Sequence, residues 1–339
     1  MKKLLALCLI LISIAASLSA SGSAEAKEAE AKKAGSRQSV ADGTHPTVII
    51  RFPTAGASGA LYSVGAAITN MWNTEIPFVK ASSQASAGGI DNLNQIADGE
   101  SQISIAISSN CWQSYNGTDS FEGMANPDLR VIAGLYLNPN QVVVTGRSGI
   151  TTLSDVKGKH FAVAASGSSV EGECSNHFTA AGLDYPGDIR AEYISFSDSA
   201  ELLRNGQIDG AWIMSGIPAA AVSQALSSGC RLLDIDTDTI AKLQETYPWY
   251  VTYTIPAGTY PNQKTDVTTT AIKMVLFCSA SLDDETVYML TKTLWENMDE
   301  LGKSQSSLRG LTMQDAVRDI AGLPLHDGAA KYYREEGIL

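Results

Sequence analysis

The sequence is poor in the side chains that enzymes and metal sites use for chemistry. It has four histidines and five cysteines in 339 residues, with no H-E-x-x-H and no C-x-x-C spacing. Zinc and thioredoxin-like sites are therefore not expected. The G-x-S-x-G elbow of hydrolases is also absent. An S-x-x-K match at 154–157 lacks its partner motifs, and it is better interpreted as a capped turn before a strand. We predict no catalytic residue, no metal site and no cofactor, and hence a protein that is not an enzyme.

Basic residues are outnumbered as well. The chain has 24 Lys and Arg against 36 Asp and Glu, a net charge of −12 at pH 7. This balance argues against nucleic acid and against an anionic membrane surface as partners. It leaves room for a small anionic ligand, because one site can be locally positive. Beyond the N-terminus no apolar run is long enough for a membrane span.

The N-terminal stretch MKKLLALCLILISIAASLSA has two lysines, an apolar run of about ten residues and then small residues. This pattern predicts a secretory signal peptide over 1–24 and export to the periplasm. Cys8 lies inside the apolar run with no small residue before it, so we expect a soluble, lipid-free product. Residues 25–45 are rich in Ala, Glu and Lys and predict a solvated, disordered leader.

Cysteine and histidine in the mature part are expected to be structural. Cys111, Cys174, Cys230 and Cys278 lie far apart in the sequence. Export would permit disulfides, but buried free thiols are the preferred interpretation. The histidines are interpreted as structural or exposed residues.

The rest of the chain alternates apolar, β-branched runs with helical stretches, at a length that suits about two domains. Strands are predicted at 47–52, 76–81, 103–108, 130–136, 141–146, 160–165, 191–196, 210–214 and 231–235. Helices are predicted at 61–73, 90–98, 198–205, 217–227 and 285–301. Such alternation favours α/β units with parallel strands buried on both faces. NLNQIADGESQISIAISSN and AELLRNGQIDGAWIMSG share one plan of helix, turn and strand. Two similar lobes facing each other across a cleft are therefore expected.

Each half also has a turn of small residues between a strand and a helix. The first is PTAGASGALYSVGAAI at 53–68, and the second lies within FAVAASGSSVEG. Neither the P-loop spacing nor G-x-G-x-x-G fits the first turn, and it has no lysine. The first N–H groups of a helix lack internal partners and carry the positive end of its dipole. A carboxylate therefore suits these turns better than a nucleotide.

The chain resembles the TAXI family, the solute-binding subunits of TRAP (tripartite ATP-independent periplasmic) transporters. The resemblance runs from about residue 47 to the C-terminal region. It rests on the first turn, GGIDNLNQIADGE, SYNGTDSFEG, SDVKGKHFAVAASGSSVEG, NGQIDGAWIMSGIPAAAV and YPWYVTYTIPAGTYPNQ, in that order.

The resemblance implies a two-lobed, type II periplasmic-binding-protein fold that closes on a solute. The implied ligand is a small carboxylate, a glutamate-like amino acid or other organic acid, delivered to a TRAP-type membrane permease. Lobe 1 is expected at 46–140 and 251–339, and lobe 2 at 141–250. Ligand contacts carried over from the resemblance are Thr54, Ser58, Gly59, Tyr62, Ser86, Asn92, Ser109, Asn110, Ser166, Gly167, Ser168, Ser169, Gly216 and Pro218.

Two other functions stay open at this point. The same lobes can serve as a ligand-sensing extracytoplasmic domain, which an adjacent sensor kinase gene would favour. A secreted α/β enzyme is the weaker alternative, and turnover of a candidate ligand would be needed to support it.

Overall fold

The computed structural model describes residues 45–56 and 60–339. The expected signal peptide lies outside these ranges, as does the expected leader up to residue 44. Ser58 and Gly59 of the first predicted ligand turn lie outside them too. From Val48 to Leu339 the chain forms one unit. No helix in the described ranges is long and apolar enough to cross a membrane.

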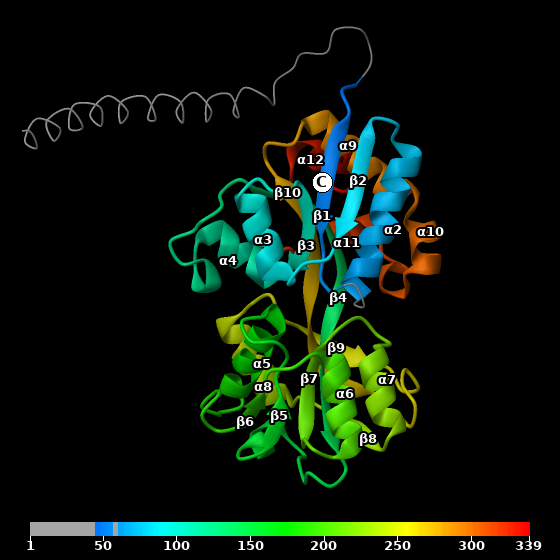
Figure 1. Ribbon diagram of the computed structural model, residues 1–339. Helices are drawn as coiled ribbons and strands as arrows, with labels where there is room; N and C mark the ends of the chain where they lie inside the picture. The colour runs from blue at the N-terminus through cyan, green and yellow to red at the C-terminus, as the bar shows by residue number, and fades with distance from the viewer. Residues whose placement is uncertain (1–44, 57–59) are drawn as a thin grey trace, which may run out of the picture. The chain divides into compact units, whose positions relative to one another are not determined.

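The first lobe, in the upper half of Figure 1, combines the N-terminal strands and helices with the C-terminal helices. Its elements are β1 (Val48–Pro53), α2 (Ala60–Glu75), β2 (Val79–Gln84), α3 (Gly89–Ala97), β3 (Ile103–Ile107), α4 (Ser108–Asn116), η1 (Asp119–Phe121), α9 (Asp284–Glu296), α10 (Met298–Ser304), η3 (Ser306–Leu308), α11 (Met313–Ala316) and α12 (Asp327–Glu335). Strands β1 and β2 pair in parallel. Helix α2 buries Val64, Ile68 and Trp72, whose spacing of four residues places them on one face.

The second lobe, in the lower half of Figure 1, contains the middle of the chain. Its elements are η2 (Leu153–Val156), β5 (His160–Ala162), α5 (Ser169–Ala180), β6 (Arg190–Glu192), α6 (Phe196–Asn205), β7 (Gly210–Met214), α7 (Ala220–Ser227), β8 (Cys230–Leu233), α8 (Thr237–Thr246) and β9 (Val251–Ile255). Strand β5 pairs in parallel with both β6 and β7. The helix–turn–strand echo is confirmed, since α3 leads to β3 and α6 leads to β7.

Two long strands, β4 (Leu129–Thr145) and β10 (Val267–Ser279), run through both lobes (Figure 1). They pair antiparallel from Ala271 opposite Pro139 to Ser279 opposite Leu129. Strand β4 then pairs with β7 and β8, and β10 pairs with β9. The central ladder is therefore antiparallel, and among the named strands of the described ranges the expected parallel pairing is found for β1 with β2 and for β5 with β6 and β7.

The prediction of two strands at 130–136 and 141–146 is wrong, because β4 is continuous. In the polar stretch between them, the side chain of Asn140 finds buried partners that hold it in the strand. Asn140 Nδ2 donates to Thr270 Oγ1 at 3.1 Å and to Glu173 Oε2 at 3.2 Å. Its Oδ1 accepts from Trp212 Nε1 at 2.9 Å.

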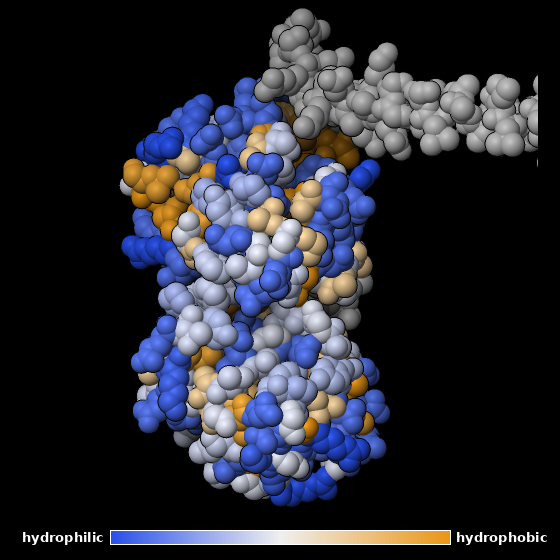
Figure 2. All heavy atoms as spheres, turned by 90° about the vertical axis from the view of Figure 1, so that its left-hand side faces the viewer, coloured by the Kyte–Doolittle hydropathy of each residue, from blue (hydrophilic) through white to orange (hydrophobic). Residues whose placement is uncertain are grey.

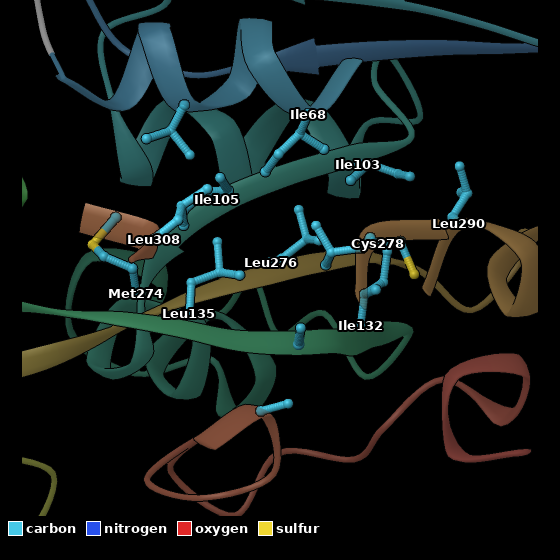
Figure 3. Close-up of a cluster of buried hydrophobic side chains, with 14 of the residues drawn as sticks. Ile68, Ile103, Ile105, Ile132, Leu135, Met274, Leu276, Cys278, Leu290 and Leu308 are labelled. Carbon is cyan, nitrogen blue, oxygen red and sulfur yellow. The ribbon is translucent and has the colours of Figure 1, made fainter. Parts of the chain in front are cut away.

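The core consists of several clusters of buried hydrophobic side chains, and the cluster that fills the first lobe also includes Met214, Leu243 and Tyr250 of the second. In the first lobe, Ile68 of α2, Ile105 of β3 and Leu276 of β10 lie together with aliphatic side chains of β4 (Figure 3). Two further clusters occupy the second lobe, one around Ala211 and Ile213 and one around Trp212. Alternate residues of β7 thus face opposite clusters, so this strand is buried on both faces as its apolar sequence predicts.

The chain stays with the second lobe beyond residue 250. Strand β9 pairs with the first five residues of β10, and Ile255, Tyr260 and Val267 pack in the cluster that contains Ala211. We expected the chain to return to the first lobe near residue 251, whereas the segment that follows packs with the second lobe. We propose β10 as the returning segment, because it is the strand that reaches both lobes.

Residues singled out as structural are in structural surroundings. All four cysteines after residue 44 are buried and unpaired. Within the S-x-x-K match, Ser154 Oγ donates to the carbonyl of Ala181 and Lys157 Nζ lies 2.9 Å from Asp188 Oδ1. These contacts hold the turn η2, which is capped by Thr152 and Asp155.

Candidate functional site

Two adjoining cavities, of about 230 and 600 Å³, lie between the lobes. Figure 2 shows the surface narrowing at this level. Both cavities share residues from the first and the second lobe: Ala55, Ala60, Ser168, Val170, Phe196, Ser215 and Gly216. We call the two together the cleft cavity. Its size is in the range of small-molecule sites.

Helix N-termini surround the cleft cavity. The first helical residues of α2, α3, α5, α6 and α7 all line it: Ala60, Gly89, Ser169, Phe196 and Ala220. Their N–H groups lack partners within the helix and carry partial positive charge. The residues Ala87, Gly88 and Gly89 are small, so a ligand can approach the backbone closely. Together these helices favour an anionic group in the cavity.

The side chains that line the cleft cavity are uncharged. Among the described residues, no Asp, Glu, Lys, Arg or His lines either part. Leu61, Ile107, Phe196, Met214 and Met274 give it an apolar wall. An anion held here would be held by backbone dipoles and hydroxyl groups, with its carbon skeleton against that wall.

Two buried polar atoms on the lining have no hydrogen-bond partner in the described part of the chain, Asn138 Oδ1 and Ser169 Oγ. Asn138 is only 7% exposed. Its Nδ2 donates to the thioether sulfur of Met274, a weak acceptor, at 3.6 Å. A buried unpaired polar group costs about 1–3 kcal/mol. A ligand that offers Asn138 Oδ1 a donor would recover this free energy.

A third cavity, of about 280 Å³, adjoins the first at Ser168 and Ser169 and is polar. It contains Ser109, Asn110 and Gly167, together with the carboxylates of Asp119, Glu171 and Glu173. Glu171 is engaged, because its Oε2 accepts from Gly167 N at 2.5 Å and its Oε1 accepts from Tyr185 OH at 2.9 Å.

Glu173 and His177 occupy one buried network beside this polar cavity. Burial raises the pKa of Glu173 to about 7, against the opposing effect of its hydrogen bond from Asn140. Burial lowers the pKa of His177 to about 4. The ring nitrogens of His177 are 2.6 Å from Glu173 O and 2.6 Å from Thr270 Oγ1. At neutral pH His177 is therefore uncharged.

Half of the predicted ligand residues line these cavities. Ser168, Ser169, Gly216 and Pro218 line the cleft cavity, and Ser109, Asn110 and Gly167 line the polar one, which Ser168 and Ser169 also reach. Ser168 is also the N-cap of α5, accepting from Glu171 N at 3.2 Å.

The side chains of three predicted ligand residues instead form hydrogen bonds within the first lobe. Asn92 is fully buried and donates to the carbonyls of Thr54 and Ile105 at 2.7 and 3.1 Å. Thr54 Oγ1 donates to Gln84 O, and Ser86 Oγ donates to Asn92 Oδ1. Their polar atoms are used inside the first lobe, so these residues line none of the three cavities.

Tyr62 and Ser166 line none of these cavities either. Tyr62 is the third residue of α2, and Ser166 is exposed in the turn before α5. Ser58 and Gly59 are outside the described residues, so their assignment stays a prediction.

Asn138, Phe196, Met214 and Met274 line the cavity and were missed from the sequence. A signal existed for Asn138, because LNPNQ places polar residues inside a long apolar run. The others are apolar and cannot be distinguished from core residues by pattern. No group of three His, Cys, Asp or Glu in the described ranges is placed to hold a metal ion.

A family model described as the NMT1-like family matches residues 52–337. The chain belongs to the NMT1-like family. Solved structures of similar fold give context for this NMT1-like chain. One, from Streptococcus mutans, is described with glutathione import via GshT and the cystine ABC importer TcyBC. It is 12% identical, with 79% of this chain and 99% of that chain covered and a TM-score of 0.50.

Two further structures show lower structural similarity. The alkanesulfonate-binding protein SsuA from Xanthomonas axonopodis pv. citri, bound to MOPS, is 17% identical over 86% of this chain and 85% of its own, with a TM-score of 0.49. The sugar acid binding protein DctPAm from Advenella mimigardefordensis, in complex with galactonate, is 12% identical over 87% and 86%, with a TM-score of 0.42. This NMT1-like chain has the two-domain α/β fold of periplasmic binding proteins, as expected from the sequence.

Proposed function

We propose that this protein is an extracytoplasmic solute-binding protein that captures a small carboxylate in the cleft cavity and delivers it to a membrane permease. The observation that carries the proposal is the convergence of five helix N-termini on an uncharged cavity lined by both lobes. Family membership and fold support a binding role. The missing nucleophile and base motifs support a protein that is not an enzyme.

The lining favours a ligand with one negative charge, an apolar skeleton and a hydrogen-bond donor. Helix dipoles suit the anion, and the apolar wall suits the skeleton. The donor would meet Asn138 Oδ1, which has no partner in the described ranges. A glutamate-like amino acid fits less well, because no lining side chain of the cleft cavity can pair with its second carboxylate or its ammonium group.

The resemblance to the TAXI family supports a TRAP-type permease, driven by an ion gradient, as the recipient. An ATP-driven importer is the competing arrangement for a protein of this fold. Uptake of the identified ligand by cells of the source organism distinguishes them. Dissipating the ion gradient should abolish uptake, and uptake that persists without the gradient while ATP is maintained would contradict a TRAP partner.

Export is supported by the N-terminal sequence pattern. Mass spectrometry of the mature protein should find an unmodified N-terminus after a small residue between Ser17 and Ala26. A diacylglyceryl cysteine there would contradict the proposal of a soluble form.

Calorimetry with matched ligands tests the carboxylate. 3-Hydroxyhexanoate has all the properties of the proposed ligand class, and hexanoate lacks only the hydroxyl donor. Compared with hexanoate, hexanesulfonate changes the anionic group and hexanamide removes the charge, while glutamate adds a second carboxylate and an ammonium group. The two carboxylates should bind, and hexanamide should lose most of the affinity. At a hundredfold excess over its Kd, a bound carboxylate should stabilise the fold by about 2.7 kcal/mol. If hexanamide binds as tightly as hexanoate, the cavity is not an anion site. If hexanesulfonate binds more tightly than hexanoate, the site is one for sulfonates. If glutamate binds more tightly, the ligand does not carry a single charge.

A further inference from the structure

A further cavity adjoins the cleft cavity at Tyr136 and Gly216, which line both. Lys273 is paired with Leu137 across the ladder, and both line this space, of about 300 Å³. The neighbouring residues Asn138 and Met274 line the cleft cavity instead. Successive residues of a strand point to opposite faces, so Lys273 and Met274 face different cavities. The first lobe contributes Arg309 and Asp315, and the second contributes Tyr253.

Lys273 brings a buried positive charge to this cavity. It is 4% exposed, and its ammonium, which has three donors, makes one described hydrogen bond, to Asp315 O at 3.2 Å. No carboxylate of the described residues lies within ion-pair distance of Nζ. Buried charges in proteins are normally paired, because an isolated one is costly to remove from water.

Two acidic groups, Asp315 and Asp319, lie near Lys273, but neither forms an ion pair with it in the described part of the chain. Asp315 Oδ2 accepts from Thr312 N at 3.0 Å and from Thr312 Oγ1 at 2.7 Å, as part of the cap of α11. Arg309 adds a second cation to the cavity. Its Nε donates to Gly302 O at 3.3 Å, and no ion pair is formed by its guanidinium within the described ranges.

We propose that this cavity is an anion-binding site that takes a small oxyanion such as phosphate between Lys273 and Arg309, two residues that do not line the adjoining cleft cavity. The ammonium supplies a point charge and free donors, and the guanidinium supplies donors in a planar fork that suits oxyanions. The site does not depend on which solute the cleft cavity binds.

Calorimetry with inorganic phosphate at constant ionic strength, on the mature chain, tests the site. Lys273→Met keeps the length of the side chain and removes the charge, and Arg309→Gln removes the second cation from an exposed position. Each should weaken phosphate binding at least tenfold. Lys303→Met is the matched control, because Lys303 is exposed and pairs with Glu300 outside the cavity. It should bind phosphate as the wild type does.

Ala60→Trp distinguishes this site from the cleft cavity, since Ala60 lines the latter and a large side chain there fills it. This variant should keep phosphate binding while losing carboxylate binding. The proposal is overturned if the wild type does not bind phosphate, if Ala60→Trp abolishes phosphate binding, or if Arg309→Gln and Lys273→Met bind like the wild type. Should Lys273→Met fail to fold, Arg309→Gln alone decides.

Discussion

Glu173 and His177 form an opposed pair of buried titrating groups. The carboxyl of Glu173, with its pKa raised from 4.5 to about 7, keeps a proton in the folded protein that it loses when unfolded. Glu173 therefore stabilises the folded state at low pH, and this stabilisation is lost as the pH rises from about 4.5 to 7. His177, with its pKa lowered from 6.5 to about 4, contributes in the opposite direction, because the unfolded chain takes up its proton between pH 6.5 and 4.

Between pH 4.5 and 6.5 the two effects cancel in the wild type. The Glu173→Gln variant keeps a neutral side chain that can form hydrogen bonds, but it removes the titrating carboxyl group, so the titration of His177 is no longer offset. The free energy of unfolding of this variant should rise by roughly 2–3 kcal/mol from pH 4.5 to 6.5 relative to the wild type, at about 1.4 kcal/mol per pH unit. Urea denaturation at both pH values measures it. Glu245→Gln, at an exposed position of α8, is the control and should leave the wild-type profile unchanged.

We expect Asn138 to bind the ligand through its Oδ1 and to lower the stability of the unliganded protein, in which this oxygen is unpaired. Asn138→Leu removes an unpartnered buried oxygen while keeping the size of the side chain, so the unliganded protein should be unchanged or about 1 kcal/mol more stable. Binding of 3-hydroxyhexanoate should weaken about tenfold, whereas hexanoate should bind as before. Calorimetry on the two ligands and two proteins gives the coupling free energy. Equal losses for both ligands would show that Asn138 does not contact the hydroxyl.

At the residue scale the sequence located the two turns but not the function of each side chain within them. Ser168 and Ser169 follow from the small-residue turn, and both line the cleft cavity. Thr54 and Asn92 belong to the same kind of segment but point into the lobe, where backbone carbonyls take their donors. A polar residue in a turn fits either role, and the partner strand that decides it is distant in sequence.

At the element scale, local patterns predicted the short amphipathic units and failed for long strands. The helix–strand units α3–β3 and α6–β7 were predicted within a few residues. Strands β9 and β10 were missed; no helix separates VTYTI from VTTTAIKMVLFCS, and the segment between them is turn-rich. The helix expected at 285–301 ends at Glu296, and α10 begins after Asn297.

At Gly65, helix α2 packs closely against Thr54, which directly follows β1, and against Ser83 of β2. A Cβ at Gly65 would lie 2.4 Å from Thr54 Cγ2 and 3.3 Å from Ser83 Oγ. Gly65→Ala should therefore destabilise the fold by about 1–3 kcal/mol, although alanine is the better helix former. Gly172→Ala in α5 is the matched control, since a Cβ there meets nothing within 4 Å. It should be neutral or stabilising by up to about 1 kcal/mol. Thermal unfolding checks both, and the same sign for the two variants would contradict the packing argument.

At the scale of the whole molecule, the two lobes were expected from the alternation of strands and helices and from the repeated helix–turn–strand segments. The way in which the lobes are connected was not expected. Strands β4 and β10 join the lobes as one ladder (Figure 1). The order of the predicted strands and the family resemblance suggested crossings near 141–147 and 247–253. Any change in the angle between the lobes must be absorbed where the two strands leave the shared ladder, near Asn140 and Thr270.

Binding should shift the population of lobe arrangements toward the one that contacts the ligand from both sides, since only differential contacts can move such an equilibrium. Small-angle scattering with and without saturating carboxylate should show a smaller radius of gyration in its presence. An unchanged radius, with binding confirmed by calorimetry, would indicate a rigid, preformed site.

A disulfide across the cleft tests the same motion chemically. A Cβ on Gly89, at the start of α3, would lie 3.3 Å from Ser169 Oγ, at the start of α5 in the other lobe. This separation is close to what two linked cysteines require, and the four native cysteines are buried. We expect the double variant Gly89→Cys, Ser169→Cys to form the bond under mild oxidation and to slow release of bound carboxylate at least tenfold, with recovery on reduction. The single variants are the controls. Unchanged release from the oxidised double variant would show that ligand leaves without separation of the lobes.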